Sequence, residues 1–327
     1  MGTFEFSYSD NNAEGRFSWN NSFDKTFESY YLAIDIYQSA NIEKALQKFR
    51  YILKKHKDFI PVINEIGWHY VERRNFSKAQ LYYKSALDFC QNKIPNSFSG
   101  IIPWYYLENR HYLRTLQGLG VTYVLAFEFQ KGLELLEKNL SLNPNDNQGN
   151  GNLLGDVHLL LNDHLKAEEY FKKYPDYWPY RYSYGVLLFQ RKQYIESIIQ
   201  FSKGILEDEY IFKVITNKEI DSVLYENPNT RSDIQDAINY HSFTLPFWFD
   251  RKIIIFLNEI FECDLLQIYI EQVNKIRKKS ESDNSFKSLK IEHIKKREII
   301  LNEMEEYKDL MDEDFALKIY MQIKHKL

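Results

Sequence analysis

Residues 63–83 read I-N-E-I-G-W-H-Y-V-E-R-R-N-F-S-K-A-Q-L-Y-Y and carry the clearest structural signal in the chain. Gly67 is followed twelve residues later by Ala79, and Tyr83 comes four residues after that. Apolar residues recur at helical spacing on both sides of the polar centre of this stretch. We therefore expect two antiparallel helices joined by a short turn, in which small residues allow a close approach and the tyrosine fills the remaining space.

The same internal spacing occurs five times along the chain. The steps between the first residues of successive series are 34, 53, 35 and 30 residues. Repeats of this length indicate helix-turn-helix units that bury their apolar faces by stacking. The five series are Ala33, Ala45 and Phe49; Gly67, Ala79 and Tyr83; Gly120, Gly132 and Leu136; Gly155, Ala167 and Phe171; and Gly185, Ser197 and Phe201.

Residues that start or stop helices occupy the expected turns. Asn41 precedes the second helix of the first unit, where its side chain can cap that helix. Ser77–Gln80 has the form of a capping box at the same place in the second unit. Pro144 is expected to end a helix, with Asp146 or Asn147 capping the next one.

This pattern resembles the tetratricopeptide repeat, a helical hairpin that recurs about every 34 residues with small and aromatic residues at set positions. Leu140–Pro144 is similar to the end of such a repeat. The segments P-W-Y-Y-L-E-N-R-H-Y-L-R-T-L-Q-G-L-G (103–120) and N-P-N-D-N-Q-G (143–149) also resemble a group of uncharacterised bacterial repeat proteins. In that group an Arg often stands where this chain has Gly151.

The resemblance covers about residues 26–210 and implies an all-α fold. We expect a right-handed α-solenoid of about five repeats over residues 26–213, after an N-terminal extension at 1–25. Residues 214–327 are expected to form a C-terminal helical region that covers the exposed apolar end of the stack.

The 53-residue step implies an insertion of about 19 residues near 91–110. One interpretation is a longer connection whose Ile101, Ile102 and Trp104 pack on the stack. The other is a lip over the inner face, formed with Trp104 and Arg110, because insertions in repeat proteins gather on one face. The sequence leaves both open.

The C-terminal third carries different signals. Ser232–Gln235 is another capping box and predicts a helix from Asp233. Leu245–Trp248 is expected to break it, a long amphipathic helix to run from about Trp248 to Lys279, and Ser280–Ser285 to form a turn.

Charge is segregated in the same region. The two stretches are either solvated helix faces that attract each other or a docking surface for an acidic partner. The basic residues are Lys275, Arg277, Lys278, Lys279, Lys287, Lys290, Lys295, Lys296 and Arg297, and the acidic residues are Glu298, Glu303, Glu305, Glu306, Asp309, Asp312, Glu313 and Asp314.

Composition limits the class of protein. The 327 residues carry a net charge of −4, and 16% of them are aromatic, which argues against disorder and against a protein that coats nucleic acid. Cys90 and Cys263 lie far apart, as expected for free thiols in a reducing cytoplasm. No secretory signal is recognisable, and the most apolar run, Ile253–Leu257, is too short to span a membrane. We expect a cytoplasmic protein.

Catalytic and cofactor motifs are not recognisable. The glycines of Gly149–Gly155 have the wrong spacing for a dinucleotide loop and no preceding strand, and no phosphate-binding loop occurs. Glu65 and His69 lack the second histidine of a zinc-binding helix, and His158 with His164 does not form a metal pattern. We expect no cofactor, no metal and no enzymatic activity.

The remaining candidate is a surface. The first helix of each unit should line the inner, concave face, and its aromatic and Arg side chains are types that anchor protein interfaces. The expected partner is a protein or peptide, with no nucleic acid and no membrane, and nothing in the sequence specifies an oligomeric state. The candidate residues are Tyr30, Asn64, Trp68, Arg114, Gln117, Asn152, Asp156 and Tyr182.

Three functions fit this surface. The first is a non-catalytic scaffold that binds a protein or peptide. The second is a regulatory or immunity-type protein that sequesters a toxin or effector and signals through its C-terminal helices, and the third, more remote, is an enzyme with a site between the repeats. A tetratricopeptide clamp for a C-terminal carboxylate would need Lys and Asn where Tyr30 and Ile34 stand, so that ligand is not expected.

Overall fold

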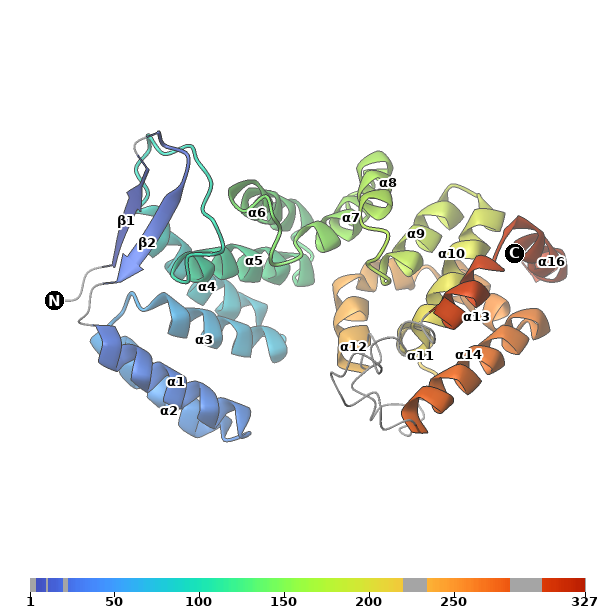
Figure 1. Ribbon diagram of the computed structural model, residues 1–327, viewed down its shortest axis with the longest axis horizontal. Helices are drawn as coiled ribbons and strands as arrows, with labels where there is room; N and C mark the ends of the chain where they lie inside the picture. The colour runs from blue at the N-terminus through green and yellow to red at the C-terminus, as the bar shows by residue number, and fades with distance from the viewer. Residues whose placement is uncertain (1–3, 10, 20–22, 220–233, 283–301, 327) are drawn as a thin grey trace. The chain divides into compact units, whose positions relative to one another are not determined.

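The computed structural model describes residues 4–9, 11–19, 23–219, 234–282 and 302–326 (Figure 1). The predicted helix start at Asp233 lies outside these residues. The chain forms two compact units, Met1–Val157 and His158–Leu327, and α7 (Gly151–Leu160) runs across the division. The division falls inside the predicted repeat region.

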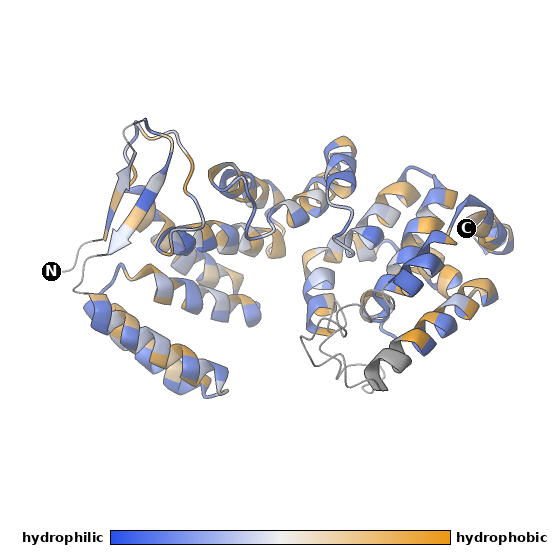
Figure 2. Cartoon of the chain, viewed as in Figure 1, coloured by the Kyte–Doolittle hydropathy of each residue, from blue (hydrophilic) through white to orange (hydrophobic). Residues whose placement is uncertain are grey.

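Unit 1 consists of three consecutive helical hairpins and a two-stranded sheet. Each helix packs against the next one along the chain, and hydrophobic residues are concentrated on one side of most helices (Figure 2). The elements are β1 (Phe4–Tyr8), β2 (Gly15–Trp19), α1 (Asp24–Gln38), α2 (Ile42–Lys55), α3 (Ile60–Glu72), α4 (Phe76–Gln91), α5 (Asn109–Leu125) and α6 (Phe129–Leu142).

Unit 2 is built around α10, which contacts α9 before it and α11, α13, α14 and α16 after it. The all-α repeat architecture with a C-terminal helical cap is therefore confirmed. The elements are α8 (His164–Lys173), α9 (Tyr180–Gln190), α10 (Tyr194–Glu207), α11 (Glu209–Thr216), α12 (Ile234–Phe243), η3 (Leu245–Phe249), α13 (Arg251–Glu262), α14 (Asp264–Ser282), α16 (Glu313–Ile323) and η5 (Lys324–Lys326).

The same left-handed turn joins the two helices of every pair. At each turn the next backbone N–H bonds to the carbonyl five residues back, as Asn75 N does to Tyr70 O at 2.9 Å, which satisfies the end of the first helix. The left-handed residues repeat with the 34-, 53-, 35- and 30-residue steps of the sequence pattern. They are Ala40 (φ 62°), Arg74 (54°), Phe127 (62°), Asn162 (61°) and Lys192 (60°).

These turns also fix where each second helix begins. Asn41 occupies the predicted N-cap position, although its side chain makes no capping bond there. Asn75 caps α4 by accepting from the backbone N–H of Lys78. The capping box expected at Ser77–Gln80 is therefore wrong, because Ser77 and Gln80 both lie inside the helix. The carboxylate of Asp146 accepts from the backbone N–H groups of Asn150, just before α7, and of Gly151, its first residue, at 2.7 and 2.8 Å, as predicted.

The small residues lie where the helices of a pair touch. A Cβ placed on Gly67 would lie 2.9 Å from the Tyr83 ring, and one on Gly185 would lie 2.7 Å from the Phe201 ring. The hydroxyl of Ser197 donates to the Gly185 carbonyl at 2.7 Å, across the same contact. The predicted contact between a small residue and a large one is confirmed in these two helical pairs.

The N-terminal hairpin was not expected from the sequence. β1 and β2 are antiparallel and pair Phe4 with Trp19. The Phe4 and Phe17 rings stack with centroids 5.0 Å apart, and Phe17 lies 5.3 Å from the Tyr112 ring of α5. The alternation of aromatic and polar residues in both strands is the signal that could have predicted them.

The inserted connection runs beside this hairpin (Figure 1). Gly15 N donates to Ile101 O at 2.8 Å, and Ile102 is fully buried. Buried Asn109 ties the pieces together, because its side chain accepts from Phe17 N at 2.8 Å and donates to the carbonyls of Gly15 and Pro103. The insertion is thus packed against the hairpin and α5 at Ile101, Ile102 and Asn109.

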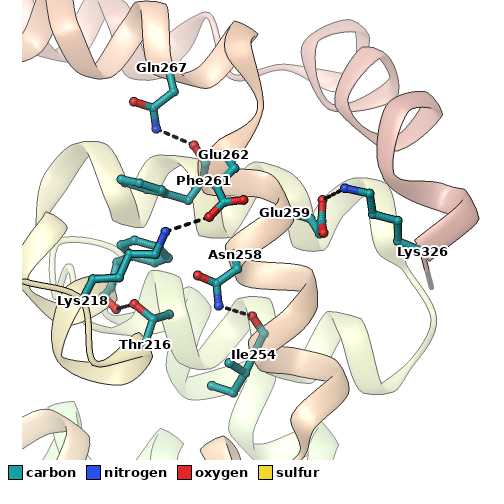
Figure 3. A network of polar contacts seen from close by, with 10 residues as sticks. Thr216, Lys218, Ile254, Asn258, Glu259, Phe261, Glu262, Gln267 and Lys326 are labelled. Carbon is teal, nitrogen blue, oxygen red and sulfur yellow. Dashed lines mark hydrogen bonds and ion pairs between the residues drawn. The ribbon is translucent and has the colours of Figure 1, made fainter.

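The C-terminal helices of unit 2 are fastened by polar contacts. Lys218, just after α11, lies 2.9 Å from the Glu262 carboxylate and 4.9 Å from the centroid of the Phe261 ring (Figure 3). Lys326, at the end of η5, pairs with Glu259. Both Glu259 and Glu262 belong to α13. Both ends of the C-terminal region are therefore attached to α13.

The expectation of one helix from Trp248 to Lys279 is wrong. Asp250 is extended and caps α13 by accepting from the Lys252 N–H at 2.9 Å, and extended Cys263 separates α13 from α14. The turn expected at Ser280–Ser285 does not begin at its predicted start, because α14 continues through residue 282. The rest of that turn lies outside the described residues.

Only part of the charged C-terminal region is described. Lys275 pairs with Glu271 at 2.9 Å, and Lys308 pairs with Glu207 of α10 at 3.0 Å. The structure does not describe the side chains of residues 277–282 or any part of residues 283–301. Most of the basic stretch, and Glu298 of the acidic one, fall in these ranges.

Substituting Gly185 tests the close contact. Alanine normally favours a helix over glycine by about 1 kcal/mol, but here its methyl group would overlap the Phe201 ring. We expect Gly185→Ala to lower the free energy of unfolding by about 1–3 kcal/mol in urea titrations. Phe201→Leu should recover part of this loss in the double variant, whereas strictly additive losses would contradict the contact.

An alanine-to-glycine substitution should have opposite effects on the free energy of unfolding at a left-handed turn position and at the residue just before one. Ala40→Gly places glycine at φ 62° and should raise the free energy of unfolding by about 0.5–1 kcal/mol. Ala126→Gly, at φ −89°, should lower it by a similar amount. Thermal or urea unfolding that gave both variants the same sign would show that the turn conformation does not control stability.

Candidate functional site

The first helices of the three pairs in unit 1 are α1, α3 and α5, and hydrogen bonds between their side chains and backbone join them along one face of the unit. Tyr30 of α1 donates from its hydroxyl to Glu65 Oε1 of α3 at 3.0 Å. Asn64 of α3 donates to the His111 carbonyl of α5 at 2.9 Å and accepts from the Thr115 hydroxyl at 2.8 Å. We name this surface the α1/α3/α5 face; it comprises Tyr31, Glu65, Trp68, Arg110, His111 and Arg114, with Trp104 of the inserted connection. Tyr30 and Asn64, which were expected on the open surface, are buried beneath it.

Burial shapes the ionisation of the central groups. It raises the pKa of Tyr30, with the negative charge of Glu65 as a further cause. Burial also raises the pKa of Glu65, against the hydrogen bond from Tyr30 and the positive charge of Arg114. Burial and the charges of Arg114 and Arg110 lower the pKa of His111 to about 3, so its imidazole is neutral at physiological pH.

Two arginines of α5 stack on one tryptophan. The guanidinium carbons of Arg110 and Arg114 lie 5.2 and 5.5 Å from the Trp104 ring centroid, and Arg110 Nε donates to the Trp104 carbonyl at 2.9 Å. Among the residues that the structure describes, neither guanidinium has a carboxylate within ion-pair distance, and Arg114 is exposed. The sequence analysis grouped Trp104 with Arg110 in the possible lip and assigned Arg114 to the inner face, without placing all three together.

Exposed aromatic rings lie on the same face. The Trp68 side chain is 43% exposed, and its indole N–H donates to Glu72 at 3.1 Å. Tyr31 is 61% exposed, with its ring centroid 5.3 Å from that of Tyr30. Phe27 lies between Tyr31 and His111, with ring centroids 6.3 and 6.4 Å away. These rings offer apolar contact area beside the arginines.

Other predicted residues have different surroundings. Gln117 donates to the Gln148 carbonyl at 2.9 Å and accepts from the Gln148 side chain at 3.1 Å, so it holds the segment before α7. Asn152 is half-buried. Asp156 and Tyr182 were expected on an open surface, and that is wrong, because they are 1% and 0% exposed.

The burial of Tyr182 has a local cause. Its hydroxyl donates to the Asp208 carbonyl at 2.6 Å, and its ring packs among those of Phe201 and Tyr240 in the core of unit 2. α12 covers that side of α9 through Tyr240. The repeat pattern alone could not show this, because α12 comes after the repeats end.

The sequence analysis missed Tyr31 and His111. Tyr31 directly follows Tyr30 on α1, and it was not singled out because the repeat spacing selects Tyr30 alone; its ring is exposed, whereas Tyr30 is buried. His111 lies between the two arginines of α5 in sequence, and that spacing on one helix was the available signal.

Metal sites and membrane-spanning helices find no support in the described residues. Within the described parts of the chain, no three His, Cys, Asp or Glu side chains come close enough to hold a metal ion. None of the described helices combines the length and apolarity needed to cross a membrane. No protein-family model matches the chain, and a search of curated proteins found no match.

The Tyr30–Glu65 hydrogen bond gives a pH-dependent prediction. The folded pKa of Glu65 is raised, so the ionised form opposes folding and its cost grows as pH rises through that pKa. Tyr30→Phe removes the hydroxyl that supports the ionised form. We expect a loss of about 1.5–3 kcal/mol at pH 7 and a smaller loss at pH 4, measured by urea unfolding.

Tyr37→Phe is the matched control. Its hydroxyl donates to Glu72 at 2.8 Å, but that carboxylate is exposed and keeps water as a partner. The loss at pH 7 should therefore be smaller than for Tyr30→Phe. Equal losses for both variants would contradict a special role for the buried pair.

Proposed function

We propose that this chain is a non-catalytic scaffold that binds a protein or peptide partner on the α1/α3/α5 face. The observation that supports this most directly is the combination of exposed Trp68, Tyr31 and Arg114 on one face. Aromatic and Arg side chains of this kind dominate the binding energy of protein interfaces. The resemblance to tetratricopeptide repeats, which we infer to be the origin of the helical pairs, is in accord with such a role.

A rigid support beneath these side chains favours binding. The hydrogen bonds from Tyr30 to Glu65 and from Thr115 to Asn64 fix the spacing of α1, α3 and α5. Trp104 in turn holds Arg110 and Arg114 in place. Binding at such a preorganised surface costs less conformational entropy than at a mobile one, because its own side chains are already ordered.

Site-specific photo-crosslinking tests this proposal. A benzoylphenylalanine residue is placed at Tyr31 or Trp68, and the protein is irradiated in cells of its native host. We expect a discrete crosslinked species at either position, identified by mass spectrometry. The same residue at Tyr51, which is 59% exposed on α2, is the control and should give none. A species at Tyr51 alone, or at none of the three positions, would overturn the proposal.

A further inference from the structure

The two arginines of α5 are a pair of like charges that forms no ion pair with any residue the structure describes. Arg110 and Arg114 are one helical turn apart, a spacing at which like charges destabilise a helix. Both guanidiniums lie over the same face of the protein, against Trp104. Stacking on an indole ring offsets part of this cost. An anion that reached both groups would remove the remaining repulsion.

The neighbouring acidic groups do not neutralise this pair. Glu65 feels the charge of Arg114, but its carboxylate is hydrogen-bonded to Tyr30, and no ion pair joins it to Arg114 in the described residues. Glu72 accepts from Trp68 and Tyr37. His111 stays neutral between the arginines and adds no third positive charge. Arg110 uses its Nε–H on the Trp104 carbonyl, and the carboxylates of Glu65 and Glu72 leave its terminal N–H groups and the guanidinium of Arg114 available to a partner.

We infer that Arg110 and Arg114 bind one carboxylate, supplied by an aspartate or glutamate side chain within a partner peptide whose apolar residues flank it on both sides. This inference rests on the proposed function. A guanidinium binds a carboxylate through two parallel hydrogen bonds, which gives a strong and directional contact.

The surroundings of Arg114 favour an internal acidic residue over a chain end. Its charge reaches Tyr30 and Glu65, and the exposed Tyr31 ring adjoins Tyr30. Arg114 also lies over the ring of Trp104 in the inserted connection. A carboxylate on Arg114 would thus have aromatic contact surface from two separate elements, α1 and the inserted connection, so the partner chain is expected to continue past it both ways.

Charge also favours a peptide over nucleic acid. A nucleic-acid backbone carries closely spaced phosphates and needs several cations along its path. The α1/α3/α5 face offers two unpaired arginines, with the carboxylates of Glu65 and Glu72 nearby, and the chain as a whole has a net charge of −4. A single carboxylate among apolar residues fits this distribution, whereas a polyanion would be repelled by the flanking acidic groups.

Peptide selection is the first part of the test. A phage-displayed library of random dodecapeptides is selected on the immobilised full-length protein, with the Tyr31→Ala/Trp68→Ala variant for counter-selection. We expect enriched sequences to carry Asp or Glu with apolar residues before and after it. Enriched peptides without an acidic residue would overturn the inference and leave the proposed function standing. Failure to enrich any peptide would count against both.

The second part assigns the contact to the arginines. A selected peptide is synthesised with its acidic residue or with the corresponding amide, and both are titrated calorimetrically. The amide should bind the unaltered protein about 10- to 100-fold more weakly, the range for a hydrogen bond to a charged group. Arg114→Gln should bind the acidic peptide as weakly as the amide, and should lose the distinction between them.

A matched variant and a competing ligand complete the test. Arg50→Gln, on exposed α2 and away from the α1/α3/α5 face, should keep the full discrimination. Circular dichroism should show unchanged helicity for Arg114→Gln and for Arg50→Gln. If Arg114→Gln still discriminates, the inference fails. Tight binding of a fluorescent 20-nucleotide oligo-dT that is lost in Arg114→Gln would also overturn it, in favour of nucleic acid.

Discussion

A large side chain lying over a small residue is the contact on which each helical pair depends. Where Gly67 faces Tyr83 and Gly185 faces Phe201, there is no room for even a methyl group. The left-handed residue in each turn sets the register that brings these positions opposite one another. Since the turn and the contact repeat together, the direction of each first helix follows from the local sequence of its own pair.

This register also places the candidate surface. The first helices α1, α3 and α5 come side by side, and side chains near their middles, Tyr30, Asn64 and Thr115, link them through hydrogen bonds. The residues that point outward from the same turns, among them Trp68 and Arg114, are thereby gathered on one face. The inserted connection contributes Trp104, which a repeat of ordinary length would not have supplied.

The sequence predicted the repeated pairs well because their determinants are local. The spacing from Gly67 to Tyr83 depends on one turn and two helices, and it is visible in a short window. Burial of Tyr182 depends on helices that come after the repeats, and the stacking of Trp104 on Arg110 and Arg114 depends on the path of an irregular connection. The break at Cys263 had no proline or glycine to mark it. Contacts between distant segments leave no periodic trace in the sequence.

The N-terminal hairpin has a consequence for how this end of the protein unfolds. In an ordinary solenoid each repeat contacts only its neighbours, so a terminal repeat can detach alone. Here Asn109 joins Phe17 and Gly15 to the start of α5, about ninety residues further on, with the first two helical pairs in between. Opening either pair strains a closed loop of chain. The first three pairs are thus coupled into a single cooperative block with high contact order, unlike a row of independently fraying modules.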